Sequence, residues 1–241
     1  MKCLILAAGY ATRLYPLTEN FPKPLLEVGG KPILDWLMAD VAPSVDEFVI
    51  VSNHKFAHIF ASWIESHPLK EKISLVDDGS VSNDTRLGAV KDIELGIKER
   101  GIDDDLLVMA GDNLLSFSLQ SFVDYFREKG TTCIMRYWED CDAKLHKTGV
   151  AEVNADGLVL SMEEKPAQPK SNWCCPPFYL YKKADLALIP EGIAAGCGTD
   201  APGSFIAWLC GRTAVHAMEM PGRRFDIGNL ESYEEVKREF K

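Results

Sequence analysis

The first residues that could carry chemistry lie in a loop that follows an apolar N-terminal run. Residues 1–8 are almost entirely apolar, the run stops at Gly9, and two cations follow at Arg13 and Lys23. Glycine permits a tight turn, and the backbone N–H groups of such a loop can form an anion-binding concavity beside fixed positive charges. The pattern therefore predicts a cradle for a polyphosphate. The alternative is an ordinary strand-to-helix loop with surface charges.

A carboxylate occupies a comparable position in the middle of the chain. Asp112 follows, after a single glycine, a second run over residues 105–110 that is apolar from Leu106 onward. In open α/β sheets ligands bind beyond the carboxyl ends of the central strands, so this carboxylate is expected to point into a ligand crevice. Mg²⁺ prefers one or two carboxylates together with substrate phosphate oxygens, which suits such a position. An Asx turn is the alternative reading of Asp112.

The elements that must position these residues alternate between strand and helix. This alternation predicts right-handed parallel units in a doubly wound α/β sheet. An Asp-Gly pair at Asp156 and Gly157 separates two short strands and is a strong hairpin signal. We expect a flexible connection over 192–203. Strands are expected at 1–8, 46–52, 73–76, 105–110, 131–136, 148–153, 158–162, 174–181 and 215–220, and helices at 31–38, 55–66, 89–98, 118–128, 204–210 and 230–236.

The composition excludes several classes of protein. The net charge of −10 has the wrong sign for a general nucleic-acid binder. No apolar stretch approaches the length needed to cross a membrane, and the N-terminal run is expected to be a strand and not a signal peptide. The 7 cysteines include no Cys-x-x-Cys spacing, so we expect neither a disulfide framework nor a zinc site. We therefore expect a cytoplasmic protein whose partners include neither nucleic acid nor a membrane.

Two stretches resemble one enzyme family. The run Leu-Ala-Ala-Gly-x-x-Thr-Arg-Leu-x-Pro-Leu-Thr from Leu6, followed by Pro-Lys-Pro-Leu from Pro22, is similar to the signature of the sugar-1-phosphate nucleotidyltransferases, in a short form like the glucose-1-phosphate thymidylyl- and uridylyltransferases. Those enzymes usually carry a second glycine where this chain has Ala11. The resemblance implies a three-layer αβα, Rossmann-like (GT-A-like) fold with a mostly parallel sheet. It also implies a small β-hairpin insertion for the acceptor, and one catalytic domain over residues 1–241.

The activity that the resemblance implies is Mg²⁺-dependent transfer of a nucleotidyl group from an NTP to a sugar 1-phosphate. On this basis Arg13 serves the leaving pyrophosphate and Lys23 the phosphates at the attack site. Lys165 pairs with the phosphate of the acceptor. Asp112 and Asp226 hold Mg²⁺, the second of them through the pattern aromatic-x-Asp-x-Gly. The expected partners are the NTP and a small phosphorylated acceptor, and a homo-oligomer is compatible with the sequence.

The resemblance also implies two sets of binding residues. One set lies partly in the loop at 77–88, where a solvated helix cap at residues 83–85 is the alternative interpretation. The other includes the turn at 163–166, where a solvated cluster of charges is the alternative. The implied nucleotide-binding residues are Leu6, Ala8, Gly9, Thr12, Arg13, Asn83, Thr85, Gly88 and Asp112. The implied acceptor-binding residues are Asn113, Gly149, Glu164, Lys165 and Tyr179.

Two other functions stay open at the level of sequence. The first is cytidylyl transfer to a non-sugar phosphate or phosphonate, such as a phosphocholine-like group. A cationic acceptor would favour an aromatic cage. The second is a catalytically silent regulatory subunit, which would have no need of both metal carboxylates. Aromatic residues available for a cage are Tyr137, Trp138, Trp173, Tyr179 and Tyr181.

Overall fold

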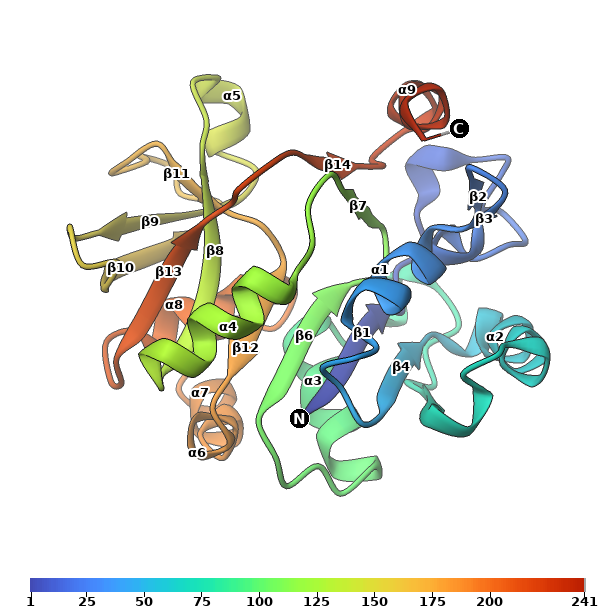
Figure 1. Ribbon diagram of the computed structural model, residues 1–241, viewed down its shortest axis with the longest axis horizontal. Helices are drawn as coiled ribbons and strands as arrows, with labels where there is room; N and C mark the ends of the chain where they lie inside the picture. Colours follow the sequence, from blue (N-terminus) through green and yellow to red (C-terminus); the bar gives the residue numbers. More distant parts are fainter. Residues whose placement is uncertain (241) are drawn as a thin grey trace.

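The computed structural model describes residues 1–240 and has one large mixed sheet at its centre. The strand order is β10-β9-β11-β8-β12-β6-β1-β4-β5, and β13 pairs with β8 outside this path. Helices lie on both faces of the sheet (Figure 1). This arrangement confirms the predicted α/β fold.

The parallel half of the sheet contains the apolar strands that the sequence predicts for the N-terminal part of the chain. β1 pairs with β4 and β6, and β4 pairs with β5, all in parallel. Their residues are apolar on both faces because helices cover both sides. The strands are β1 (Lys2–Ala7), β4 (Phe48–Ser52), β5 (Ile73–Asp77) and β6 (Leu106–Ala110), and the helices between them are α1 (Ile33–Val41), α2 (His54–Ser66) and α3 (Ala89–Glu99).

The other half of the sheet is largely antiparallel, and the predicted hairpin is confirmed there as β9 and β10. β13 joins this half as a parallel neighbour of β8. The strands are β8 (Thr132–Trp138), β9 (Gly149–Val153), β10 (Val159–Glu164), β11 (Trp173–Cys175), β12 (Phe178–Tyr181) and β13 (Val215–Glu219). The helices of this half are α4 (Gln120–Lys129), α5 (Asp142–Leu145), α6 (Lys183–Leu186), α7 (Ile189–Ala194) and α8 (Gly203–Leu209).

Two expectations for this half are wrong. Residues 174–181 do not form one strand, because Pro176 and Pro177 lack the N–H groups that a continuous ladder needs. The chain changes partners there, from β8 and β9 to β6 and β8. The stretch 192–203 is not a loose connection either. It begins inside α7, and its end is bound to α3: the N–H groups of Ala89 and Val90 donate to the carbonyls of Asp200 and Thr199 at 3.2 and 3.0 Å.

Two small sheets and a C-terminal helix complete the fold. β7 (Asn113–Leu115) pairs with β14 (Arg224–Asp226), and β2 (Glu27–Val28) pairs with β3 (Lys31–Pro32). The side chain of Asn229 caps α9 (Leu230–Glu239) by accepting the Ser232 N–H at 2.8 Å. In Figure 1 the chain runs from β13 through β14 to α9 and so connects the two halves of the molecule.

The described residues 1–240 contain no helix with the length and apolarity needed to cross a bilayer. All 7 cysteines are free thiols.

Candidate active site

Hydrogen bonds fix one side of the loop after β1, and its other side is exposed. The side chain of Asn53 donates to the carbonyl oxygen of Ala8 at 3.0 Å, and the Tyr10 and Ser80 hydroxyls lie 3.3 Å apart. Gly9 is exposed, and a Cβ added there would meet no atom within 4 Å. The loop is therefore rigidly attached at the carboxyl edge of the sheet while its outer surface stays open to a ligand.

Ala11, where the resembled enzymes usually carry a second glycine, adopts the left-handed backbone conformation. Its φ is 47° and its ψ 40°. For a residue with a Cβ this conformation costs about 1–2 kcal/mol. The Thr18 hydroxyl, which is buried, donates to the Ala11 carbonyl at 2.8 Å and fixes the bend. The turn therefore keeps its shape without the second glycine, and it presents Thr12 and Arg13 on the exposed side of the loop.

The most direct link between the two motifs is an ion pair. The ammonium group of Lys23 lies 2.7 Å from Oδ2 of Asp112, although Lys23 is only 7% exposed. Burial alone would raise the pKa of Asp112, but the Lys23 charge outweighs it, and Arg224 acts in the same direction, so that pKa is lowered. The carboxylate is therefore charged at neutral pH, as a metal ligand must be.

The pairing of β7 with β14 sets Asp226 opposite the residue that follows Asp112. Asp226 stands opposite Asn113 in the antiparallel register, and Asn113 directly follows Asp112. The Asn113 amide donates to Oδ1 of Asp112 at 2.7 Å. Arg13 also reaches this loop, since a Cβ placed on Gly228 would lie 3.9 Å from its Nη1. Residues from both ends of the chain thus meet at the carboxyl edge of β1 and β6.

The carboxylates available here suit magnesium better than a metal held wholly by protein. Among residues 1–240, no group of three or more His, Cys, Asp or Glu side chains could hold an ion. Asp112 and Asp226 are both accessible, at 35% and 54% side-chain exposure. Two carboxylates open to solvent and to a polyphosphate are the donor set that Mg²⁺ prefers.

Two of the residues predicted to contact the nucleobase, Thr85 and Gly88, make contacts within the protein. Thr85 Oγ1 accepts the N–H groups of Val81 and Ser82, both at 3.1 Å, in a capping arrangement. Gly88 is buried with a φ of 95°, and a Cβ there would approach the carbonyl oxygen of Thr199 to 2.5 Å. The structure therefore gives Thr85 and Gly88 definite roles in the fold, whereas Asn83 is exposed.

Two of the predicted acceptor residues, Gly149 and Tyr179, lie close to the carboxylate of Glu164, whereas Asn113 lies beside Asp112 on β7. A Cβ on Gly149 would lie 3.0 Å from Glu164 Oε2, and one on Gly203 would lie 2.3 Å from the same atom and 3.2 Å from the Tyr179 hydroxyl. These two glycines leave room for the carboxylate between them. Burial raises the pKa of Glu164, while the nearby charge of Lys165 acts in the opposite direction.

A cavity of about 420 Å³ opens beside Glu164 and Lys165. Its far wall is formed by Thr199, Asp200 and neighbouring residues. Asp200 lies 3.6 Å from the Lys165 ammonium group and 2.7 Å from the Arg86 guanidinium. It therefore connects the acceptor turn to the loop before α3. The sequence reading missed Asp200 because it treated residues 192–203 as a connection.

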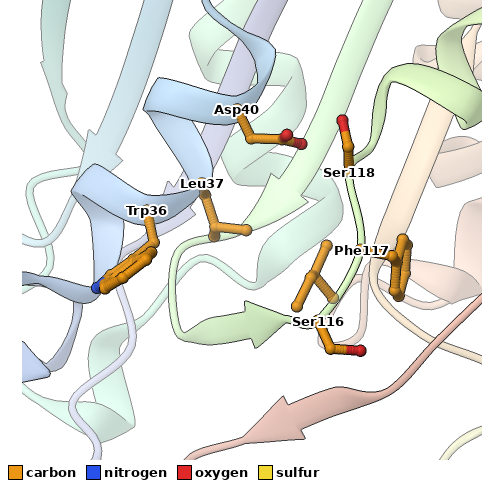
Figure 2. Close-up of a pocket in the computed structure, with 7 residues that line it drawn as sticks. Trp36, Leu37, Asp40, Ser116, Phe117 and Ser118 are labelled. Atoms are coloured by element: carbon orange, nitrogen blue, oxygen red, sulfur yellow. The ribbon is translucent and has the colours of Figure 1, made fainter. Parts of the chain in front are cut away.

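A second cavity, of about 260 Å³, lies between α1 and the segment that follows β7 (Figure 2). It contains none of the predicted site residues. Asp40 on its wall accepts the Leu119 N–H at 2.6 Å and so serves to hold the start of α4. We therefore do not include this cavity in the candidate site.

The five aromatic residues considered for a cation cage do not form one. Tyr179 and Tyr181 are buried in the core. The Trp138 and Trp173 rings meet edge to face with 5.1 Å between centroids. The Arg136 guanidinium already lies 4.1 Å from the centroid of Trp173. This arrangement gives no support to a phosphocholine-like acceptor.

Two buried carboxylates below the base loop each have one oxygen without a hydrogen-bond partner. Asp78 Oδ2 and Asp92 Oδ1 are both buried and unpaired. Burial, with a smaller contribution from repulsion by Asp78, raises the pKa of Asp92 to about 7. An acid with a raised pKa in the folded state keeps its proton when the unfolded chain has lost it, so its contribution makes stability fall as pH rises from about 4 to 7.

We expect Asp92→Asn to remove this loss of stability. The amide carries no charge to bury, so the variant should exceed the parent protein by up to roughly 4 kcal/mol in unfolding free energy at pH 8 and differ little at pH 4. Urea denaturation at both pH values measures the difference. The exposed neighbour Asp84, changed to Asn, is the control and should have no effect. Equal stability of Asp92→Asn and the parent at pH 8 would contradict the expectation.

Comparison with known proteins gives a consistent result. A family model described as "Nucleotidyl transferase" matches residues 2–241. The chain is 27% identical to "Bifunctional protein GlmU" of Methanocaldococcus jannaschii over 95% of its length, and 31% identical to a "Glucose-1-phosphate thymidylyltransferase" of Mycobacterium tuberculosis over 80%. It spans 51% and 65% of the lengths of these two relatives.

Solved structures agree on the fold. A crystal structure of UDP-glucose pyrophosphorylase complexed with UDP-glucose superposes with a TM-score of 0.82 at 20% identity, covering 99% of this chain and 97% of the other. At that identity the likeness concerns the fold alone.

Proposed function

This chain belongs to the nucleotidyl transferase family, and from that premise we propose that it transfers a nucleotidyl group from an NTP to a sugar 1-phosphate. An oxygen of the acceptor phosphate forms a bond to the α-phosphorus, and the bond from that phosphorus to the bridging oxygen breaks. The products are an NDP-sugar and pyrophosphate. No proton has to be removed, because the attacking oxygen is already anionic.

One observation above all supports this proposal. The Lys23 ammonium group is paired with Asp112 at 2.7 Å, at the point where the strand register sets Asp226 opposite Asn113. The open loop after β1 lies beside them, and a separate cavity opens beside Glu164 and Lys165. A phosphate-binding loop, two accessible carboxylates and an acceptor-sized cavity are what an in-line displacement between two anions requires.

The residues of this chain act by positioning and by charge. Arg13 stabilises the negative charge that develops on the leaving pyrophosphate, and Lys23 neutralises the phosphates at the attack site. Lys165 binds the phosphate of the acceptor. Glu164, held between Gly149 and Gly203, accepts hydrogen bonds from sugar hydroxyls.

Magnesium fits this site through Asp112 and Asp226. When bound, Mg²⁺ neutralises phosphate charge and keeps the attacking and leaving groups in line. The lowered pKa of Asp112 keeps that ligand deprotonated at neutral pH. We propose Mg²⁺ as the cofactor on these grounds.

A pyrophosphate-release assay tests the function directly. The chain is incubated with each of five NTPs (ATP, GTP, CTP, UTP and dTTP) and a panel of sugar 1-phosphates, with phosphocholine as a further acceptor. We expect release with at least one NTP and a sugar 1-phosphate. Release only with CTP and phosphocholine would favour the cytidylyltransferase alternative, and no release at all would favour the silent subunit.

The remaining parts of the proposal concern the setting of the enzyme. We propose that residues 1–241 act as a single catalytic domain, supported by the family match over residues 2–241. A cytoplasmic location is supported by the 7 free thiols, since such thiols persist in a reducing compartment.

A further inference from the structure

Arg224 is a charged residue in the centre of the site to which the sequence reading gave no role. Its side chain is only 16% exposed. Its Nη1 donates to Oδ1 of Asn113 at 2.7 Å and lies 3.8 Å from Oδ2 of Asp226. Its guanidinium carbon is 5.8 Å from the ring centroid of Tyr137. Arg224 thus stands between the carboxylates of the nucleotide side and a strand of the acceptor side.

The strand register explains why the side chain points there. Phe225 stands opposite Leu114, and both are buried in the small core that packs against α9. Side chains alternate along a strand, so Arg224 and Asp226 must both face the other way. That face is the one on which Asn113 lies, opposite Asp226. The direction of the guanidinium is therefore determined by the burial of its neighbour.

Tyr137 connects this position to the acceptor cavity. It is paired with Cys174 of β11, and the next residue, Cys175, is paired with Gly149. Gly149 in turn borders the carboxylate of Glu164. On the proposed function the acceptor phosphate approaches Asp112 and Asp226 from the side of Tyr137 and Glu164. Arg224 lies between these two groups of residues.

Two other cations of the site, Lys23 and Lys165, already have partners within the chain. Lys23 is bound to Asp112 at 2.7 Å, and Lys165 is 3.6 Å from Asp200. The Arg224 guanidinium has several N–H donors in a planar fork, and the hydrogen bond to Asn113 uses one of its nitrogens. The fork matches the spacing of phosphate oxygens and can bind them in a bidentate manner.

Resting on the function proposed above, we propose that Arg224 is a further catalytic residue, which donates hydrogen bonds to the acceptor phosphate as it approaches the α-phosphorus. Asn113 and Asp226 hold the guanidinium in place. The acceptor class that this arrangement selects is a phosphate monoester whose doubly charged group needs a fixed cation beside the metal carboxylates.

The test compares Arg224→Gln and Arg224→Lys with Arg223→Gln. Arg223 is the matched control, because it is the next residue, its side chain is 66% exposed, and it lies 4.0 Å from Glu239 on α9. With the most active NTP and acceptor of the parent protein, we expect Arg224→Gln to lower kcat about tenfold and to raise the KM of the acceptor, with the Kd of the NTP unchanged. The kcat of Arg224→Lys should lie between those of the parent protein and Arg224→Gln, because lysine keeps the positive charge but lacks the planar fork of N–H donors.

Two further measurements separate catalysis from a structural role. Addition of guanidinium ion at millimolar concentration should restore part of the kcat of Arg224→Ala, whereas a variant that had merely lost packing would not respond. Circular dichroism identifies any variant that fails to fold. If Arg224→Gln does not fold, the kinetics of Arg224→Lys are compared with those of Arg223→Gln instead.

The outcomes are distinct. An Arg224→Gln protein that is folded and matches Arg223→Gln in kcat and acceptor KM would overturn the inference, as would weaker NTP binding with an unchanged acceptor KM. If the parent protein releases no pyrophosphate with any pair of substrates, the proposed function fails, and this inference fails with it.

Discussion

Replacement of Asp112 or Asp226 by asparagine is expected to lower turnover by roughly a hundred- to a thousandfold, because each change removes a carboxylate from the pair that suits Mg²⁺. Asparagine has nearly the same shape, so the fold should persist in both variants. The two should differ in stability. Asp112→Asn leaves the buried Lys23 without its anionic partner, whereas Asp226 is 54% exposed and is 3.8 Å from its nearest cation. We therefore expect a lower Tm for Asp112→Asn alone.

The measurements are turnover as a function of Mg²⁺ concentration, Mn²⁺ binding followed by electron paramagnetic resonance, and thermal unfolding by circular dichroism. Asp124→Asn is the control, since Asp124 is exposed on α4 and its side chain bonds to Gln120 and Arg127 of the same helix. It should match the parent protein in all three. Turnover near the parent value in either site variant would remove that residue from the metal site.

The elements around the nucleotide loop could be predicted because their signals are local. Apolar runs bounded by glycine and turn residues identify β1, β4 and β6, and apolar residues at 33, 34, 37 and 38, spaced as on one face of a helix, identify α1. The position of Asp112 follows from the same rule, since it comes just after the end of β6. Composition and periodicity are sufficient where one strand and its own loop define the geometry.

The approach of Asp226 to Asp112 has no such local signal. It depends on two strands of three residues each, β7 and β14, whose pairing is specified by the burial of Leu114 and Phe225 against α9. Only the family pattern pointed to Asp226. Arg224 could have been suspected, because strand alternation places it on the same face as Asp226, but nothing in the sequence says that this face meets Asn113.

The acceptor side was predicted less completely for a related reason. Asp200 reaches the site through backbone hydrogen bonds that attach its loop to the start of α3. Backbone hydrogen bonds of this kind do not depend on which side chains are present, so the sequence does not reveal them. A run of small residues reads as a flexible connection unless the closeness of its partner is known, and here that partner is Gly88, where a Cβ would lie 2.5 Å from the Thr199 carbonyl oxygen.

Lys165 and Arg13 should be distinguishable by kinetics, because we assign them to different substrates. Lys165→Ala should raise the KM of the acceptor with little change in the Kd of the NTP. Arg13→Ala should lower kcat, because its charge is needed most when the pyrophosphate departs. A hydrogen bond to a charged group contributes about 1.5–3 kcal/mol, so we expect losses of about ten- to a hundredfold in kcat/KM for each variant.

The contacts of Lys165 make its assignment a demanding test. Its ammonium group lies 3.6 Å from Asp200, an exposed pair that adds little to stability, so the alanine variant should unfold at nearly the parent temperature. Lys170, an exposed lysine in the segment that follows the Glu-Lys-Pro turn, is the matched control, and Lys170→Ala should leave the kinetics unchanged. If Lys165→Ala weakened NTP binding and left the acceptor KM unchanged, the turn would face the nucleotide. The cavity beside Glu164 would then have to be reassigned, because Lys165 lines it together with Asp200.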